Sequence, residues 1–399
     1  MSSFARNAIV LGLLSAVGPF AIDMYLPALP AITTNLQTST AATQMTLTMF
    51  FVTFGLCQIA WGPLSDVWGR KAPLYGGLGL FIAGSIGCAL APSVGWVIAF
   101  RVLQGAGAAA MGVIPRAIIR DLHTGIEATK LMSLVMLVFS VSPILAPLAG
   151  SALIAPFGWR AVFFAVAMVA VVGLLLVATL LPETRPAHAR IGGSFREVLR
   201  AFGELMRDGN FLGLVSIGGL GLASFFTFLA MSSFVYIGHY GLTTTQYSLA
   251  FSVNAVGFIG VAQFAGALGG RFGMGRMVMT AVSAYAGFAV LLLALTLAGF
   301  DNLGLLIALL FASNACLGLI VPSTLVMSME RHGAIAGVAS ALGGTLQMLM
   351  GGVMIAGASL FFDGTSLPMV ATIALIALAA LAVSVATLRN FRLETSLAE

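Results

Sequence analysis

The sequence predicts an all-α polytopic membrane protein with twelve transmembrane helices in two pseudo-symmetric six-helix halves. Of its 399 residues, 60% are hydrophobic and only 8% are charged, which is far from the composition of soluble domains. The apolar runs are long and lack the alternation of a membrane β-barrel, so they predict helices. A short pattern after the second run returns after the eighth, which predicts two equivalent halves.

Each helix needs about 20 apolar residues to cross the bilayer core. On this criterion we expect spans at 7–32, 43–64, 73–92, 96–117, 131–155, 160–181, 211–237, 246–270, 277–299, 303–326, 333–361 and 367–388. The two halves then cover 1–181 and 211–399. The connection 182–210 is too short for a soluble domain. It contains an amphipathic segment that starts with the capping pair Ser194 and Glu197, which predicts an interfacial helix against the lipid bilayer.

The basic residues predict the orientation of the chain. Of the 18 Lys and Arg, all but Arg101 and Arg160 fall in the loops of one side. We therefore expect both termini in the cytoplasm. The net charge of +5 reflects this bias, and no basic patch of the kind that binds nucleic acid is present.

Asp23 is the one acid of the thirteen that falls inside a predicted span. An ionisable side chain at that depth costs several kcal/mol unless it faces protein or water, so it indicates function. We interpret Asp23 as a proton carrier that loads on the outside and unloads on the inside. Two structural alternatives stay open: Asp23 caps a broken helix, or it pairs with Arg101 only to hold the bundle together.

The turn after the second span, residues 61–71, carries both charge signs, and residues 266–276 after the eighth span repeat its pattern. The matching pairs, all at one offset, are Gly62 with Gly266, Leu64 with Leu268 and Gly69 with Gly273. Six spans are therefore predicted to repeat as six.

The first turn resembles the loop signature of the major facilitator superfamily, Gly-x-Leu-x-Asp-x-x-Gly-Arg-Lys. The resemblance implies two six-helix halves that rock about a central site, with the signature acid pinning them together on the cytoplasmic side. It assigns this gate to Gly62, Asp66, Gly69, Arg70 and Lys71. The fourth span ends with Arg116, Arg120 and Asp121, which we expect close enough to Asp66 to join this charge cluster. The second turn has Gly270 in place of the acid, so its latch is expected to be weaker. A plain topological stop signal would explain only the two basic residues.

The fourth span contains Arg101 in the pattern Arg-x-x-Gln-Gly-x-Gly-Ala-Ala, which resembles the fourth-helix motif of proton-coupled members of the superfamily. The resemblance implies that Arg101 and Gln104 belong to a proton relay. Snorkelling of Arg101 to the outer surface is the alternative. The small residues 105–110 predict close helix packing.

The fifth span partly resembles the signature of the drug antiporters, Gly-x-x-x-Gly-Pro-x-x-Gly-Gly. At the defined positions of this signature, the present sequence has Ser142, Ala146, Pro147, Gly150 and Ser151. The residues are still small, and small residues would let this helix press against a partner in the other half. A helix that is merely kinked by its prolines is the rival interpretation.

Residues 21–28, Ala-Ile-Asp-Met-Tyr-Leu-Pro-Ala, together with these motifs resemble the Bcr/CflA branch of the drug:proton antiporters. The resemblance implies export of small amphipathic drugs of the bicyclomycin and chloramphenicol kind across a bacterial inner membrane, by a protein that works as a monomer. Residue type and span position suggest that the central cavity is lined by Tyr25, Gln44, Gln58, Phe228, Tyr236 and Asn254.

Two other functions stay open. A proton-coupled symporter for uptake of a small metabolite would use the same acid, with both fluxes in one direction. A membrane-embedded receptor or enzyme is the more distant alternative, because no span carries paired acids, a HExxH motif or a nucleophile with a base. The four His and three Cys lack metal-ligand spacing, so we expect no metal and no cofactor.

Overall fold

The computed structural model describes residues 3–123, 125–185 and 195–397. Within these ranges all regular secondary structure is helical, and no strand is present. Among the described residues, eleven helices are long and apolar enough to cross a membrane. The count rises to twelve spans if the helices α10 (Thr244–Ala262) and α11 (Ala265–Phe272), bent by 42°, form one span. The prediction of a polytopic helical membrane protein is confirmed.

The chain divides into two compact units, Met1–Phe195 (unit 1) and Arg196–Glu399 (unit 2). Each unit is described by itself. The expected boundaries at 1–181, 182–210 and 211–399 remain a prediction.

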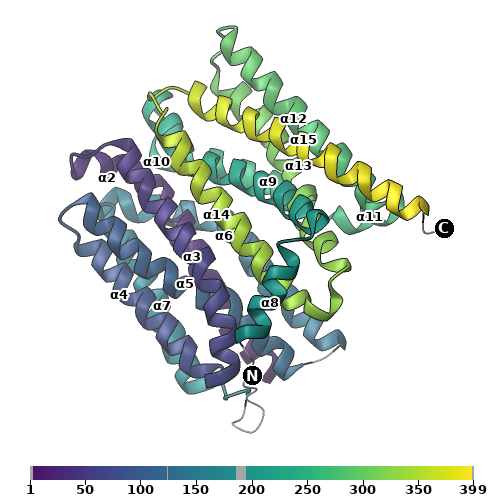
Figure 1. Cartoon of the computed structure of the whole chain (residues 1–399). Coiled ribbons are helices and arrows are strands. Elements are labelled where there is room, and N and C mark those ends of the chain that lie inside the picture. Colours follow the sequence, from purple (N-terminus) through teal and green to yellow (C-terminus); the bar gives the residue numbers. More distant parts are fainter. Residues whose placement is uncertain (1–2, 124, 186–194, 398–399) are drawn as a thin grey trace. The chain divides into compact units, whose positions relative to one another are not determined.

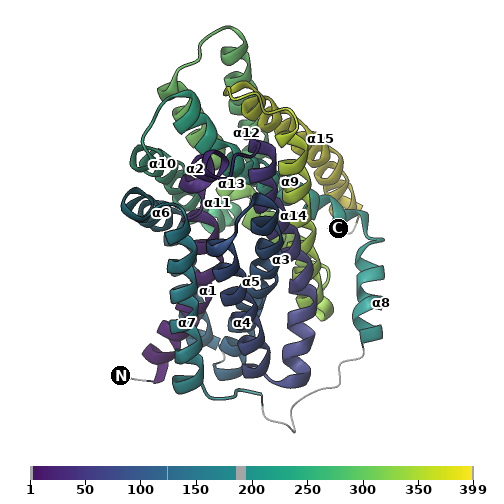
Figure 2. The ribbon, with the colours of Figure 1, turned by 90° about the vertical axis from the view of Figure 1, so that its left-hand side faces the viewer.

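Unit 1 is a bundle in which α5 packs on α3 and α4, while α1 packs on α6 and α7 (Figure 1). Its helices are α1 (Ser3–Asp23), η1 (Leu26–Ala28), α2 (Leu29–Asn35), α3 (Thr40–Trp68), α4 (Lys71–Leu90), α5 (Val94–Leu122), α6 (Gly125–Phe157) and α7 (Arg160–Leu180). The N-terminal end of α1 lies at the same end of unit 1 as the turn from α3 to α4 (Figure 2). We call this the basic end, because the turn carries Arg70 and Lys71.

Unit 2 repeats this packing with different helices. Its elements are α8 (Phe195–Leu205), α9 (Gly209–Ser233), the π-helical segment η3 (Phe234–His239), α10, α11, α12 (Met274–Leu297), α13 (Leu303–Glu330), η4 (Gly333–Ile335), α14 (Ala336–Ser359) and α15 (Leu367–Leu397). Here α13 packs on α10 and α12, while α9 packs on α14 and α15. These pairs correspond one by one to those of unit 1, as the internal repeat predicts.

The two copies of the repeated turn also share a backbone conformation. Gly69 has a φ of 87° and Gly273 a φ of 83°, a left-handed region that glycine enters without the steric cost of a Cβ atom. The pairing of these two glycines in the sequence therefore has a structural cause.

Small residues bring the helices of unit 1 into backbone contact. A methyl group on Gly105 of α5 would lie 2.6 Å from the carbonyl oxygen of Phe50 on α3. A methyl group on Gly107 would overlap the backbone of α4 at Gly77 and Phe81. The predicted helix-packing role of residues 105–110 is confirmed.

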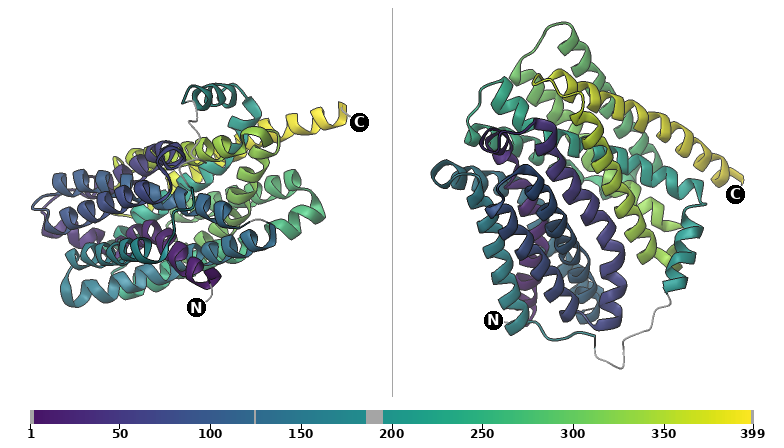
Figure 3. Two further views of the ribbon diagram at one scale, coloured as in Figure 1. Left: turned by 90° about the horizontal axis from the view of Figure 1, so that it is seen from below. Right: turned by 60° about the vertical axis from the view of Figure 1, so that its left-hand side comes forward.

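The amphipathic segment of the linker forms α8, whose C-terminal end packs against α9 and α14 within unit 2 (Figure 3, right). Its predicted cap, Ser194, lies outside the described residues. Leu205 is fully buried in a cluster formed with Phe211, Val215, Ala339 and Leu342. Part of the apolar face of α8 therefore covers protein, whereas Met206, just after the helix, is exposed.

Asp208 caps the first span of unit 2. Its Oδ1 accepts hydrogen bonds from the backbone N–H groups of Asn210 (2.8 Å) and Phe211 (3.2 Å), and its Oδ2 lies 2.8 Å from Nε2 of His332. Burial alone would raise the pKa of Asp208, but the hydrogen bonds from His332 and from the helix N-terminus outweigh it and lower the pKa. The carboxylate therefore stabilises the start of α9.

Removing this cap should destabilise the protein. Asp208→Ala is expected to reduce the free energy of unfolding by about 1 kcal/mol at pH 7, and Asp208→Asn, which keeps one acceptor oxygen, by less. Because the folded-state pKa is lowered, the contribution of the charge is present above the unfolded value of about 3.9 and is lost as pH falls through the folded-state pKa. Thermal unfolding in detergent across this pH range measures both effects, and a wild-type midpoint for Asp208→Ala at pH 7 would contradict the assignment.

Candidate functional site

The first span is broken next to its acid. Helix α1 ends at Asp23, and the chain continues through η1 and α2 to Asn35. Pro27 and Pro30 follow within the next turns, and a proline has no N–H with which to continue the hydrogen-bond ladder. The carbonyl groups at the end of α1 therefore need other partners.

The side chain of Asp23 is buried at 5% exposure. The described part of the chain gives it neither a salt bridge nor a hydrogen bond to its carboxylate. The alternatives of an ion pair with Arg101 and of a helix-capping hydrogen bond are therefore wrong in this structure. What the site contains is a buried carboxyl group without a counter-charge.

Arg101 of α5 instead binds the broken end of α1. Its Nη1 donates to the carbonyl oxygen of Ala21 (3.2 Å) and to Oε1 of Gln104 (2.6 Å). Its guanidinium lies 4.7 Å from the ring centre of Tyr25 and 4.3 Å from that of Phe50. The side chain is completely buried, so the snorkelling alternative is wrong.

Gln104 extends this network to α4. Its Nε2 donates to Oγ of Ser85 (2.7 Å), which in turn donates to the carbonyl oxygen of Phe81. The structure thus brings Arg101 and Gln104 together as predicted, and links them to the backbone of the first span. Their assignment to a proton relay remains a prediction.

The antiporter-like stretch of α6 also lies against the break in the first span. Ser142 and Ala146 are buried, and the helix continues through Pro147. A methyl group on Gly150 would overlap the carbonyl oxygen of Met24 and lie 3.0 Å from its carbonyl carbon. At Gly150, α6 therefore contacts the backbone of Met24, the residue that follows Asp23 in the same unit.

The predicted cavity residues of unit 1 lie in different surroundings. The hydroxyl of Tyr25 is hydrogen-bonded to Oγ1 of Thr46 (2.7 Å), next to Arg101. Gln44 is fully buried on α3, and Gln58, further along α3, is half-buried. Tyr25 thus belongs to the Asp23–Arg101 region, whereas Gln58 lies more than three helical turns beyond Gln44.

The predicted cavity residues of unit 2 belong to one aromatic cluster. Phe228 stacks on Phe251 with ring centres 5.5 Å apart, and Tyr236 lies 6.3 Å from Phe228 and 6.0 Å from Tyr247. Tyr236 sits in the π-helical segment η3, a conformation that often marks functional sites. The sequence reasoning missed Tyr247 and Phe251, although both stand at helical spacing from Asn254.

Amide and hydroxyl groups border this cluster. Nδ2 of Asn314 donates to Oδ1 of Asn254 (3.3 Å), and the hydroxyls of Ser232 and Tyr247 lie 3.1 Å apart. Asn254 and Asn314 are both buried. The cluster can therefore offer ring faces and neutral hydrogen-bonding groups to a ligand, with no formal charge on the residues named here.

The gate residues of unit 1 form an ion-pair cluster at the basic end. Nη1 of Arg70 lies 2.8 Å from Asp66, and Nε of Arg70 lies 2.7 Å from Asp121. Asp66 is also paired with Arg185 at 2.9 Å. Burial alone would lower the pKa of Arg70, but the hydrogen bonds and negative charges of Asp121 and Asp66 outweigh it and raise the pKa.

Two predicted members of this cluster do not pair as expected. Arg120 is exposed, whereas Asp121, which was also expected in the cluster, binds Arg70. The Nζ atom of Lys71 lies 5.8 Å from the ring centre of Tyr75, and no ion pair joins it to an acid among the described residues. Neither side chain contributes to the pairing that the other gate residues make.

The sequence reasoning also missed the contribution of Glu183. Its carboxylate accepts hydrogen bonds from the backbone N–H groups of Arg70 (2.9 Å) and Lys71 (3.1 Å) at the start of α4. Thr184 donates to Asp121 at 3.1 Å. The signal was the sequence Pro-Glu-Thr-Arg at 182–185, directly after the sixth span, where both charge signs return.

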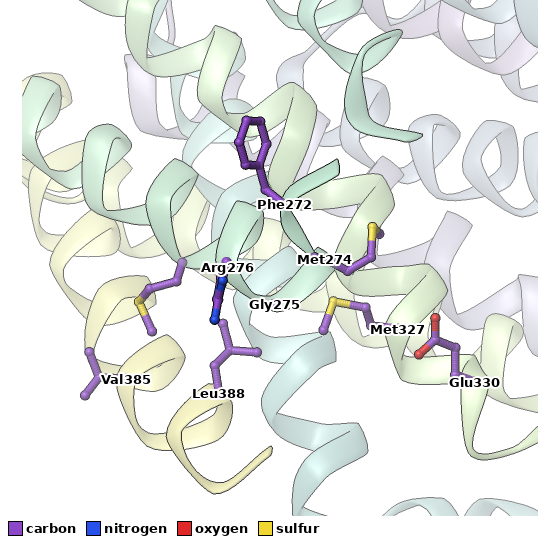
Figure 4. Close-up of a pocket in the computed structure, with 10 residues that line it drawn as sticks. Phe272, Met274, Gly275, Arg276, Met327, Glu330, Val385 and Leu388 are labelled. Carbon is purple, nitrogen blue, oxygen red and sulfur yellow. The ribbon is translucent and has the colours of Figure 1, made fainter. Parts of the chain in front are cut away.

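The second copy of the turn is built differently. Met274 stands at the position of Arg70, and no ion pair is found among the described residues of this turn. A pocket of about 810 Å³ lies here between the turn, the end of α13 and α15. In Figure 4, Arg276 points toward Leu388, while Glu330 lies on the other side beyond Met327. The weaker latch expected from Gly270 remains a prediction.

Known proteins resemble this chain in sequence and fold. The family model described as Major Facilitator Superfamily matches residues 11–355. The MFS-type transporter YdgK of Bacillus subtilis is 35% identical over 350 residues, covering 87% of both chains. The bicyclomycin resistance protein homolog of Haemophilus influenzae is 31% identical over 393 residues, covering 96% of both. The solved D-xylose-proton symporter shares the fold, with a TM-score of 0.72 at 18% identity over 95% of this chain and 97% of that one.

Proposed function

Because this chain belongs to the Major Facilitator Superfamily, we propose that it exports small amphipathic drugs in exchange for protons by alternating access. Membership supports a membrane transporter of small molecules rather than an enzyme. The relative named as a bicyclomycin resistance protein homolog supports a drug of the bicyclomycin or chloramphenicol kind as the substrate. The route is across a bacterial inner membrane, with both termini in the cytoplasm and the monomer as the working unit.

The observation that carries this proposal is the buried, unpaired carboxyl group of Asp23. An ionised carboxyl group needs water or a cation, whereas the neutral acid needs neither. Asp23 therefore takes up a proton when it is open to the outside and releases it when it is open to the cytoplasm. Drug binding favours the deprotonated conformation, so the drug leaves as the proton enters.

Arg101 supports this cycle through the backbone of α1. Because its Nη1 binds the carbonyl oxygen of Ala21, it stabilises the break that carries Asp23. The same Nη1 also donates to Oε1 of Gln104 at 2.6 Å. In this mechanism the pair responds to the state of Asp23, and the proton itself is carried by the acid.

The remaining parts divide between binding and gating. The aromatic cluster around Phe228 and Tyr236, with Asn254, supplies ring faces and amide groups for an amphipathic drug. Tyr25, Gln44 and Gln58 are the corresponding candidates from unit 1. The ion pairs of Asp66 and Arg70 hold the cytoplasmic gate, and the second turn contributes a weaker one.

Everted membrane vesicles test the function directly. Respiration acidifies their interior, and a pH-sensitive dye reports the loss of acidity when a drug added outside is exchanged for protons. We expect bicyclomycin or a chloramphenicol-type drug to restore the dye signal in vesicles that contain the protein and to leave vesicles without it unchanged. The absence of a response to a panel of cationic, neutral and zwitterionic drugs would contradict export. Acid-driven accumulation of a metabolite in right-side-out vesicles would then identify a symporter.

A further inference from the structure

The residues next to Asp23 are held by contacts with three other helices. On one side, Nη1 of Arg101 binds the carbonyl oxygen of Ala21, two residues before the acid. On another, the hydroxyl of Tyr25, two residues after it, is hydrogen-bonded to Thr46 of α3. The third contact is that of Gly150 of α6 with the carbonyl group of Met24. The carboxyl group itself has no described partner, so its position depends on these contacts of the neighbouring residues.

The contact at Gly150 leaves no space for a side chain. A Cβ atom there would overlap the carbonyl oxygen of Met24, lie 3.0 Å from its carbonyl carbon and lie 3.1 Å from its Cα atom. These are backbone atoms, which cannot rotate away as the end of a flexible side chain can. Any larger residue at position 150 must therefore displace Met24, and with it the adjacent Asp23.

The equivalent helix pair of unit 2 is built in another way. There a methyl group on Gly351 of α14 would meet the ring of Phe226 on α9, which is a side chain. Of these two helix pairs, only the contact of α6 with the end of α1 is a contact with backbone atoms, and it lies where the first span is broken next to Asp23.

We propose that Gly150 is a positioning residue for proton coupling: by admitting the Met24 carbonyl, it sets the depth at which Asp23 is held. This inference rests on the proposed function insofar as Asp23 carries the proton. The antiporter-like sequence of α6 then packs against the break that follows α1 in the same unit. Gly150 acts only through the position of Asp23 and does not contact the proton.

The protonation of Asp23 can be measured without a drug. Dicyclohexylcarbodiimide reacts with protonated carboxyl groups in apolar surroundings, and mass spectrometry of the labelled peptide gives the extent of reaction as a function of pH. Gly150→Ala is expected to move the midpoint of this curve by about one pH unit and to move the pH optimum of drug-driven proton release with it.

Gly18→Ala is the matched control. Gly18 lies on the same helix as Asp23, and a methyl group there would meet Phe54 at 3.7 Å and Ala108 at 3.9 Å, which are ordinary contacts. Its midpoint should equal that of wild type. A folded Gly150→Ala protein with the wild-type midpoint would overturn the proposal.

A milder variant decides the question if Gly150→Ala does not insert into the membrane. Tyr25→Phe removes the hydrogen bond to Thr46 without adding volume, and should shift the midpoint measurably, by about half a pH unit. An unchanged midpoint in this variant would overturn the backbone mechanism. Because the labelling needs no substrate, a shift seen while all drugs fail to release protons would support the positioning role and contradict drug export.

Discussion

Asp23→Asn should reduce proton-driven drug export to the rate of vesicles that lack the protein. Asparagine has nearly the same size and remains neutral at every pH, so it cannot release a proton to the cytoplasm. Since the carboxylate of Asp23 has no described partner, the substitution breaks no ion pair, and the protein should insert and unfold as wild type does. Dye recovery in everted vesicles measures the export, and downhill drug movement without a pH gradient should persist.

Asp363→Asn is the control for the loss of a carboxylate. Asp363 is exposed in the loop between α14 and α15, where it accepts hydrogen bonds only locally, from Thr365. Its export rate should match that of wild type. Proton-driven export by Asp23→Asn at the wild-type rate would exclude Asp23 as the proton carrier.

Arg70→Met should destabilise unit 1 and open the gate at the basic end. The substitution copies Met274 of the second turn, and it leaves Asp121 and Ser65 without the donor that they now share. Breaking a buried ion pair costs about 3–5 kcal/mol. Because Asp66 is 45% exposed and keeps Arg185, we expect about 2–3 kcal/mol. The midpoint of thermal unfolding should fall by roughly 5 °C, and drug should leak through resting liposomes.

Lys71→Met provides the matched comparison for this variant. It removes the same charge from the adjacent position of the same turn, but the side chain of Lys71 forms no described ion pair. Its unfolding midpoint should stay within about 1 °C of wild type, because a partly exposed charge without an ion pair contributes little. Equal loss of stability in the two variants would show that net charge matters at this turn, and not the pairing of Arg70.

The sequence is enough to predict the helical class, the spans and the repeated turn, because each depends on local composition or spacing. The bilayer requires long apolar runs, and the turn requires a glycine with positive φ at Gly69 and Gly273. The one complication is the eighth span, where α10 and α11 meet at a bend of 42°. The segment contains no proline to cause this bend, so the sequence pattern did not predict it.

The partners of the charged residues could be predicted only in part. A buried arginine was expected to bind an acid, a carbonyl group or water. The structure shows a carbonyl group, that of Ala21 at the end of α1, which the sequence could not single out. Arg70 and Asp121 were correctly placed in the cluster of Asp66. Glu183 was missed, because it follows a span that meets the turn only in the folded bundle. A sequence pattern specifies which residue needs a partner, whereas the packing of distant helices decides which group is near enough.

The arrangement around the break in α1 has a consequence for how the protein is made. The first span enters the membrane with a buried acid and with the carbonyl group of Ala21 still without Arg101. Arg101 and Gly150 lie about 80 and about 130 residues further along the chain. At about 5–20 residues per second, the contact with Gly150 is possible only some 6 to 25 s after Asp23 has been synthesised. During that interval the insertion machinery has to shelter the first span, and ribosome pausing or chaperone depletion should harm this span before any other.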